Sequence, residues 1–187
     1  DLALDAGYWW SWLFTHLRAA DRHDELRRTA TDLRYLVHKA QARSALAVEP
    51  DLAMACAQFP DDAVLAQLRR SYTQATALLT ACSSAADAMT TLLARLAFVP
   101  GLDSVVVGAA ARSGPRLVCV EPPPDMPHPA LIRTLGEHRC AMSACVLSAD
   151  GRRLAAADSD RLVLIWDAVS GNQLLVIKDL MPRALAI

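Results

Sequence analysis

The stretch Leu131–Leu175, LIRTLGEHRCAMSACVLSADGRRLAAADSDRLVLIWDAVSGNQLL, decides the fold class of the C-terminal part of the chain. Short apolar runs alternate in it with turn-forming residues. Gly151 and Gly171 fall between such runs, where hairpin turns need the positive φ that glycine adopts without strain. The pattern predicts an antiparallel sheet with strands at Ala141–Leu147, Arg153–Ala157, Leu162–Trp166 and Gln173–Ile177, and an additional short apolar strand at Ala130–Leu135.

One of these expected strands is apolar on both faces. Leu162, Leu164 and the residues that alternate with them are all aliphatic. A strand of this kind is typical of the middle of a sheet, where both faces are covered. We therefore expect Leu162–Trp166 to be a central strand.

The spacing of strands and turns, ending in the dipeptide Trp166-Asp167, resembles one unit of the WD-repeat β-propeller family. The resemblance implies that His138, Asp160 and Trp166 join through a strand Ser or Thr in a chain of hydrogen bonds. Such a chain locks a blade and performs no chemistry.

The sequence departs from this family pattern at two positions. Glu137 stands where the family usually has glycine before the histidine. The position expected to hold Ser or Thr is Ala156, or alternatively Asp158. We therefore expect an incomplete hydrogen-bonded chain and a loosely held blade.

A single blade does not make a propeller, because closure takes about four to eight blades and a lone unit leaves bare strand edges. The chain also begins at Asp1 rather than at methionine. The sequence thus predicts a piece of a longer protein, with residues 130–187 as the first WD-repeat blade of a truncated propeller.

Composition restricts the function classes. Hydrophobic residues make up 53% of the chain, enough for a core, and the net charge of −1 gives no attraction to nucleic acid or anionic lipid. The cysteines are five, scattered and without a CxxC pair, which indicates a reducing, cytoplasmic location and no metal site. We expect neither nucleic acid nor membrane as a partner.

Residues 1–111 are expected to be helical, since Gly7 is the only glycine before residue 101. Asp32, Asp62 and Ser83 or Ser84 precede apolar stripes at helical spacing and predict helix N-caps. Several helices with short connections favour an antiparallel bundle or a short α-solenoid. The expected fold class is therefore mainly α, followed by one four-stranded antiparallel WD-repeat blade.

The first expected helix, about Leu4–Ala20, is rich in tryptophan. Trp9, Trp12, Leu13, His16 and Leu17 share one helical face and are expected to form a core stripe. Trp10 lies off that stripe and is expected to be half covered by another domain. An aromatic ligand or partner site is the alternative interpretation of the tryptophan cluster.

A second resemblance rests on YWWSWLFTHLRAA at 8–20, DEL at 24–26, DLRYL at 32–36 and KA at 39–40. The series is similar to the helical domain of apoptotic protease-activating-factor-type signalling ATPases, the STAND class, although Tyr35 replaces a tryptophan. In that class the domain follows an NB-ARC nucleotide-binding module and precedes WD repeats. The resemblance implies ATP or ADP bound in an upstream module, with no cofactor in this chain.

Residues 112–129 are expected to be a linker. Arg116–Val120 has the composition of a short strand, and five of the nine residues 121–129 are proline. Such a run is expected to be an extended, semi-rigid spacer. A proline-rich ligand for another domain is the alternative.

No catalytic site is expected, because the chain contains neither a G-x-x-x-x-G-K-[ST] phosphate loop nor a G-x-S-x-G nucleophile turn. The first hypothesis is a non-enzymatic fragment of an NB-ARC/WD-repeat signalling ATPase. It would couple a propeller that binds protein partners to a nucleotide module that oligomerises, with Trp10 as the contact to that module. The alternative is a helical adaptor with a WD propeller and no nucleotide module.

Overall fold

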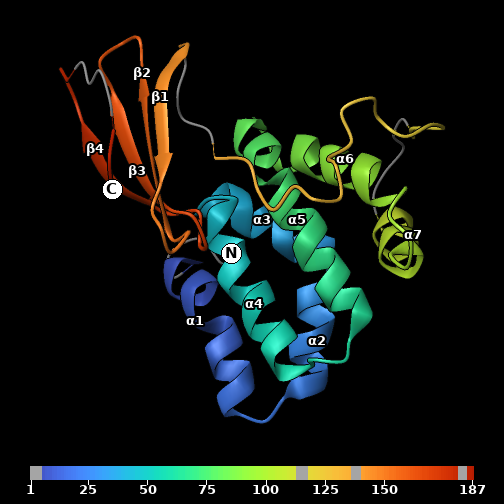
Figure 1. Ribbon diagram of the computed structural model, residues 1–187. Coiled ribbons are helices and arrows are strands. Elements are labelled where there is room, and N and C mark those ends of the chain that lie inside the picture. The colour runs from blue at the N-terminus through green and yellow to red at the C-terminus, as the bar shows by residue number, and fades with distance from the viewer. Residues whose placement is uncertain (1–5, 113–117, 136–139, 181–184) are drawn as a thin grey trace. The chain divides into compact units, whose positions relative to one another are not determined.

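The computed structural model describes residues 6–112, 118–135, 140–180 and 185–187. The chain divides into a helical unit, Asp1–Thr134, and a sheet unit, Leu135–Ile187 (Figure 1). In these described residues the helical unit contains seven α-helices: α1 (Ala6–Ala19), α2 (His23–Thr31), α3 (Leu33–Ala42), α4 (Glu49–Gln58), α5 (Ala63–Ala81), α6 (Ala85–Leu96) and α7 (Asp103–Ala111). A 3-10 turn, Leu46–Val48, precedes α4.

The helix ends follow the local chemistry that the sequence indicated. Asp32 caps α3, Asp62 caps α5 and Ser84 caps α6, each accepting a backbone N–H of the first helical turn. The C-terminus of α1 is closed by a Schellman pair in which the N–H of Arg22 bonds the carbonyl of Leu17, with Asp21 at φ 56°. The predicted caps are confirmed.

The core of the helical unit takes side chains from all seven described helices, with α5 packed against both α4 and α6 and α3 packed against α6. Its members repeat at helical spacing, as expected for amphipathic helices that face one another. Fully buried side chains from these helices include Leu33, Leu36, Leu65, Leu68, Tyr72, Leu79, Leu92 and Leu96.

The face of α1 that packs inward differs from the predicted stripe. Phe14 and Leu17 are buried, whereas Trp9 and Trp12 are each 50% exposed. The predicted core stripe through Trp9 and Trp12 is therefore wrong. Instead, the helix buries the face that carries Trp10, Phe14 and Leu17, and Phe14 packs on Tyr35 of α3. Two faces of this helix are apolar, and residue spacing alone could not decide which of them is buried.

The sheet unit is a four-stranded antiparallel sheet in the order β1-β2-β3-β4, with each strand beside its neighbour in sequence. The strands are β1 (Met142–Leu147), β2 (Arg153–Asp158), β3 (Val163–Asp167) and β4 (Gln173–Ile177). Gly151 at φ 69° and Gly171 at φ 78° make the first and last turns, as predicted. β2 and β3 are the inner strands, which confirms the expected central strand.

Two further predicted strands do not form in the described residues. Ala130–Leu135 is not a strand, and the Leu131 carbonyl accepts a hydrogen bond from the Gln74 side chain instead of from a neighbouring strand. Residues 118–120 are likewise non-regular, and Val118 and Val120 are exposed. Apolar composition predicted strands there, but no described strand pairs with either segment.

Candidate functional site

The turn between β2 and β3 is held by the side chain of Asp158. Asp158 is buried, and its Oδ1 accepts the N–H groups of Asp160 and Leu162 at 2.9 and 3.0 Å. Asp160 instead accepts the thiol of Cys140 at 2.8 Å, and this hydrogen bond raises the pKa of Cys140. An Asx turn built on Asp158 therefore shapes this end of the sheet.

The Trp166-Asp167 dipeptide closes the third strand. The Trp166 ring is buried and packs with Ala156 and Leu164 on one face of the inner strands. Asp167 accepts the N–H groups of Val169 and Ser170 at 3.0 and 2.7 Å, which fixes the turn into β4. Both residues have structural roles in the strand end and the turn.

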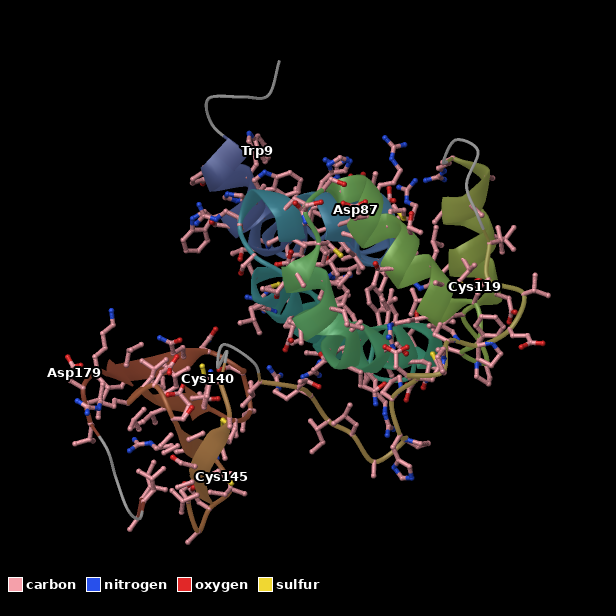
Figure 2. The ribbon with its side chains drawn as sticks, turned by 90° about the horizontal axis from the view of Figure 1, so that it is seen from above. Trp9, Asp87, Cys119, Cys140, Cys145 and Asp179 are labelled. Carbon is pink, nitrogen blue, oxygen red and sulfur yellow. The ribbon has the colours of Figure 1, made fainter. Side chains whose placement is uncertain are left out.

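The predicted blade-locking chain cannot be followed throughout. His138 lies outside the described residues, so the proposed link through His138, Asp160 and Trp166 stays a prediction. The strand position expected to hold Ser or Thr is either Ala156, whose side chain is buried and apolar, or Asp158, which is buried and accepts the turn N–H groups. Cys140, which Figure 2 labels, donates to Asp160 and is a partner that the family pattern did not indicate.

The edge strands of the sheet carry uncovered apolar side chains. On β4, Leu174, Leu175 and Val176 are 54%, 49% and 38% exposed. Because neighbouring residues of a strand point to opposite faces, β4 is apolar on both sides. Met142 and Leu147 on β1 are also more than half exposed. No strand in the described residues pairs with the outer edge of β1 or β4.

Four residues of the motif series meet in the helical unit. The rings of Trp10 and Phe14 lie 5.5 and 5.6 Å from that of Tyr35, and Lys39 lies 6.0 Å from the same ring. Trp10 is consequently half-buried on α3, while Trp9 lies on the outer side of α1 (Figure 2). The more exposed aromatic side chains of α1 are Tyr8, Trp9 and Trp12.

A buried charged pair joins α3 to the start of α4. The Lys39 ammonium and the Tyr35 hydroxyl both donate to Asp51 Oδ2 at 2.6 Å. Lys39 and Asp51 are 3% and 6% exposed. Burial raises the pKa of Asp51, and the hydrogen bonds from Lys39 and Tyr35 offset part of that effect. In the sequence Lys39 was noted only as part of the motif series, because an ion pair between two helices has no local sequence signal.

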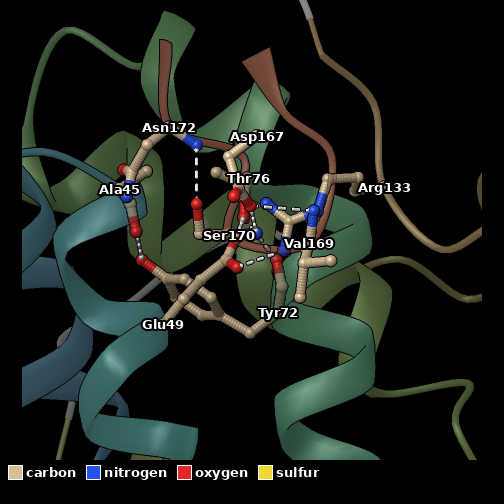
Figure 3. A network of polar contacts seen from close by, with 9 residues as sticks. All are labelled: Ala45, Glu49, Tyr72, Thr76, Arg133, Asp167, Val169, Ser170 and Asn172. Carbon is tan, nitrogen blue, oxygen red and sulfur yellow. Dashed lines mark hydrogen bonds and ion pairs between the residues drawn. The ribbon is translucent and has the colours of Figure 1, made fainter. Parts of the chain in front are cut away.

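A second polar cluster surrounds Glu49 on the first turn of α4 (Figure 3). Thr76 donates to Glu49 at 3.0 Å and Arg133 donates to it at 2.7 Å. Nearby, the Tyr72 hydroxyl donates to the carbonyl of Ala45 at 3.1 Å. The helix N-terminus favours the carboxylate, and the two side-chain donors neutralise and satisfy it.

The carboxylates of both clusters are held by hydrogen bonds from side chains of other elements. The carboxylates of Glu49 and Asp51 are used by neighbouring donors. Among the described residues, no group of three or more His, Cys, Asp or Glu side chains is placed to hold a metal ion. None of the helices in that part of the chain combines the length and apolar character needed to cross a membrane.

No protein-family model matches the sequence, and no curated protein or solved structure shows a significant match to the chain. The two resemblances described above therefore rest on the residues of this chain alone.

Proposed function

We propose that the chain is a non-catalytic coupling segment, in which a helical domain leads into the first blade of a WD-type propeller that binds proteins. The observation that carries this proposal is the apolar edge strand β4. Its Leu174 and Leu175 point to opposite faces, and both are about half exposed. An exposed edge strand of this composition promotes aggregation in a free sheet, and it is stabilised where further strands cover it.

We further propose that the chain belongs to a signalling ATPase of the STAND class, and the helical unit supports this. Trp10, Tyr35 and Lys39 belong to the motif series, and the three side chains pack together. Through Asp51 they connect α1, α3 and α4 into one block. A block of this kind suits a rigid arm between a ligand-sensing propeller and a nucleotide module.

In the proposed mechanism, ligand binding to the propeller shifts an equilibrium between two arrangements of the arm and the upstream module. ATP or ADP would be bound by that module, and the active arrangement would oligomerise. Coupling requires that both ends bias the same two-state interface. Trp10 remains the proposed contact, with Trp9 and Trp12 as its more exposed neighbours on α1.

The test is to read the coding sequence on both sides of this chain. A phosphate-loop motif followed by a winged-helix pattern upstream, with further Trp-Asp units downstream, would support the signalling ATPase. Trp-Asp units without a phosphate loop would replace it with the helical adaptor. The absence of both would contradict the proposal.

A further inference from the structure

The segment Asp125–Arg133, here named the strap, is bound along the helical unit rather than extended away from it (Figure 1). Residues 121–129, which overlap the strap, had been expected to be a semi-rigid spacer. Two turns interrupt the proline-rich run, since Met126 N–H bonds the Pro123 carbonyl at 3.2 Å and Leu131 N–H bonds the His128 carbonyl at 2.8 Å. The strap therefore has a defined shape on the surface of α5 and α6.

Side chains from three helices hold the strap along its length. Arg95 on α6 pairs with the Asp125 carboxylate at 2.5 Å and also bonds the Asp125 carbonyl at 3.2 Å. Arg70 on α5 donates to the Pro129 carbonyl. These contacts recognise one acidic side chain, that of Asp125, and two backbone carbonyls, those of Asp125 and Pro129.

The C-terminal end of the strap is held by a second pair of contacts. Gln74 on α5 donates to the Leu131 carbonyl at 2.6 Å. Arg133 pairs with Glu49 at 2.7 Å, and each of these two side chains is only 10% exposed (Figure 3). The Glu49–Arg133 pair is the most enclosed ion pair on the strap and serves as its latch.

Beneath the strap a cavity of about 220 Å³ remains between it and the two helices. Its wall combines the aliphatic and aromatic side chains Phe98 and Val99 with Pro127 and Pro129 of the strap. An apolar lining with a few placed polar groups is the usual composition of a ligand-binding pocket.

From these contacts we propose that the α5–α6 groove is a recognition site for a proline-containing peptide with an acidic residue near one end and an arginine near the other, filled here in cis by the strap. Because the strap is part of the same chain, it occupies the groove at high effective concentration. A competing peptide of the same chemistry gains access only when the strap detaches. This proposal concerns the helical unit and does not depend on the proposed function.

The first test measures strap detachment as tryptic cleavage after Arg133 in the full chain under native conditions. Glu49→Gln removes the charge of the latch, and Arg70→Ala removes an exposed donor to the strap without touching the core. Each should accelerate this cleavage about tenfold, the change expected from losing one charge-assisted hydrogen bond. Glu25→Gln, which alters the exposed Arg22–Glu25 pair on α2, is the matched control and should cleave at the wild-type rate.

The second test measures binding of a fluorescent peptide with the sequence of residues 121–135. The Arg133→Ala chain should bind it about tenfold more tightly than the wild-type chain, because its own strap competes less well. A peptide with Asp125→Lys and Arg133→Glu should bind neither chain. Equal binding of the two peptides, or no tighter binding to the Arg133→Ala chain, would overturn the recognition site. Unchanged cleavage in both Glu49→Gln and Arg70→Ala would overturn the detachable strap.

Discussion

The helical unit and the sheet unit bury their apolar side chains to different degrees. In the helical unit the large aliphatic side chains of α3, α5 and α6 are buried against one another. In the sheet unit the buried cluster consists of Ala156, Leu164 and Trp166, and the apolar side chains of β4 remain exposed. The helical unit thus buries most of its large apolar side chains, whereas the edge strands of the sheet leave theirs exposed, as the proposed further strands would require.

The largest effect is expected from breaking the buried pair that makes the helical unit rigid. Lys39→Ala leaves the Asp51 carboxylate buried beside one remaining donor, Tyr35, and should lower the free energy of unfolding by about 3–5 kcal/mol. Chemical denaturation of the full chain, followed by helical circular dichroism, measures this change.

Two further variants sharpen that test. Lys39→Met combined with Asp51→Leu replaces the pair by apolar groups and should recover most of the loss. Arg22→Ala, at an exposed ion pair, should cost less than about 1 kcal/mol. A loss equal to that of Arg22→Ala in the Lys39→Ala chain would show that the buried pair does not stabilise the unit.

A slightly smaller loss is expected from a cavity in the helical core. Leu68 is fully buried on α5, and Leu68→Ala should lower the free energy of unfolding by about 2–5 kcal/mol. Leu175→Ala on β4 should change it by less than about 1 kcal/mol, because half of that side chain is already exposed. Equal losses at the two leucines would contradict the contrast between the units.

The next effect concerns the pH dependence of the helical unit. Burial acts to raise the pKa of Asp62, but the hydrogen bond from Arg27 and those from the N–H groups of Leu65 and Val64 hold it below its usual value. A lowered carboxyl pKa stabilises the fold above its unfolded-state pKa, and the stabilisation is lost as the pH falls through the folded-state value.

Two variants at Asp62 separate the cap from the charge. Asp62→Ala should cost about 1 kcal/mol at neutral pH, since the N-cap is lost. Asp62→Asn keeps a capping oxygen, so its smaller cost should disappear as the pH falls below about 4, where aspartate protonates. Denaturation curves from neutral to acidic pH measure both. A cost of Asp62→Asn that grows on acidification would contradict the assignment.

The smallest effect on stability is expected at the edge of the sheet. Leu174→Lys on β4 should change the free energy of unfolding by no more than about 0.5 kcal/mol, yet it should reduce self-association of the chain. Leu78→Lys, at an exposed leucine of α5, is the matched control and should leave association unchanged. Sedimentation velocity over a range of concentrations measures both. If Leu174→Lys leaves self-association unaltered, the proposal that a partner strand covers β4 would be contradicted.

Local signals in the sequence predicted a large part of the fold. The caps at Asp32 and Asp62 and the turns at Gly151 and Gly171 depend on a few neighbouring residues, and each was predicted correctly. The same holds for the strand Gln173–Ile177, which has the predicted bounds. Sequence patterns of this kind reflect interactions between residues that are close together in the chain.

Features that depend on distant residues were missed or misplaced. The Lys39–Asp51 pair and the Glu49–Arg133 latch join separate elements, and neither side chain of a pair indicates the other in sequence. The apolar run Ala130–Leu135 predicted a strand, but in the structure its Leu131 and Arg133 contact Gln74 and Glu49 instead. Two faces of α1 are apolar, and packing on Tyr35 decides which of them is buried.

Hydrogen–deuterium exchange of the full chain tests the central contrast most directly, because it reports the stability of each unit within one molecule. The account predicts that amides in the middle of α5 exchange only through global unfolding of the helical unit, whereas amides of β4 exchange orders of magnitude faster. Protection of β4 equal to that of α5 would contradict it, because the sheet would then be complete without further strands.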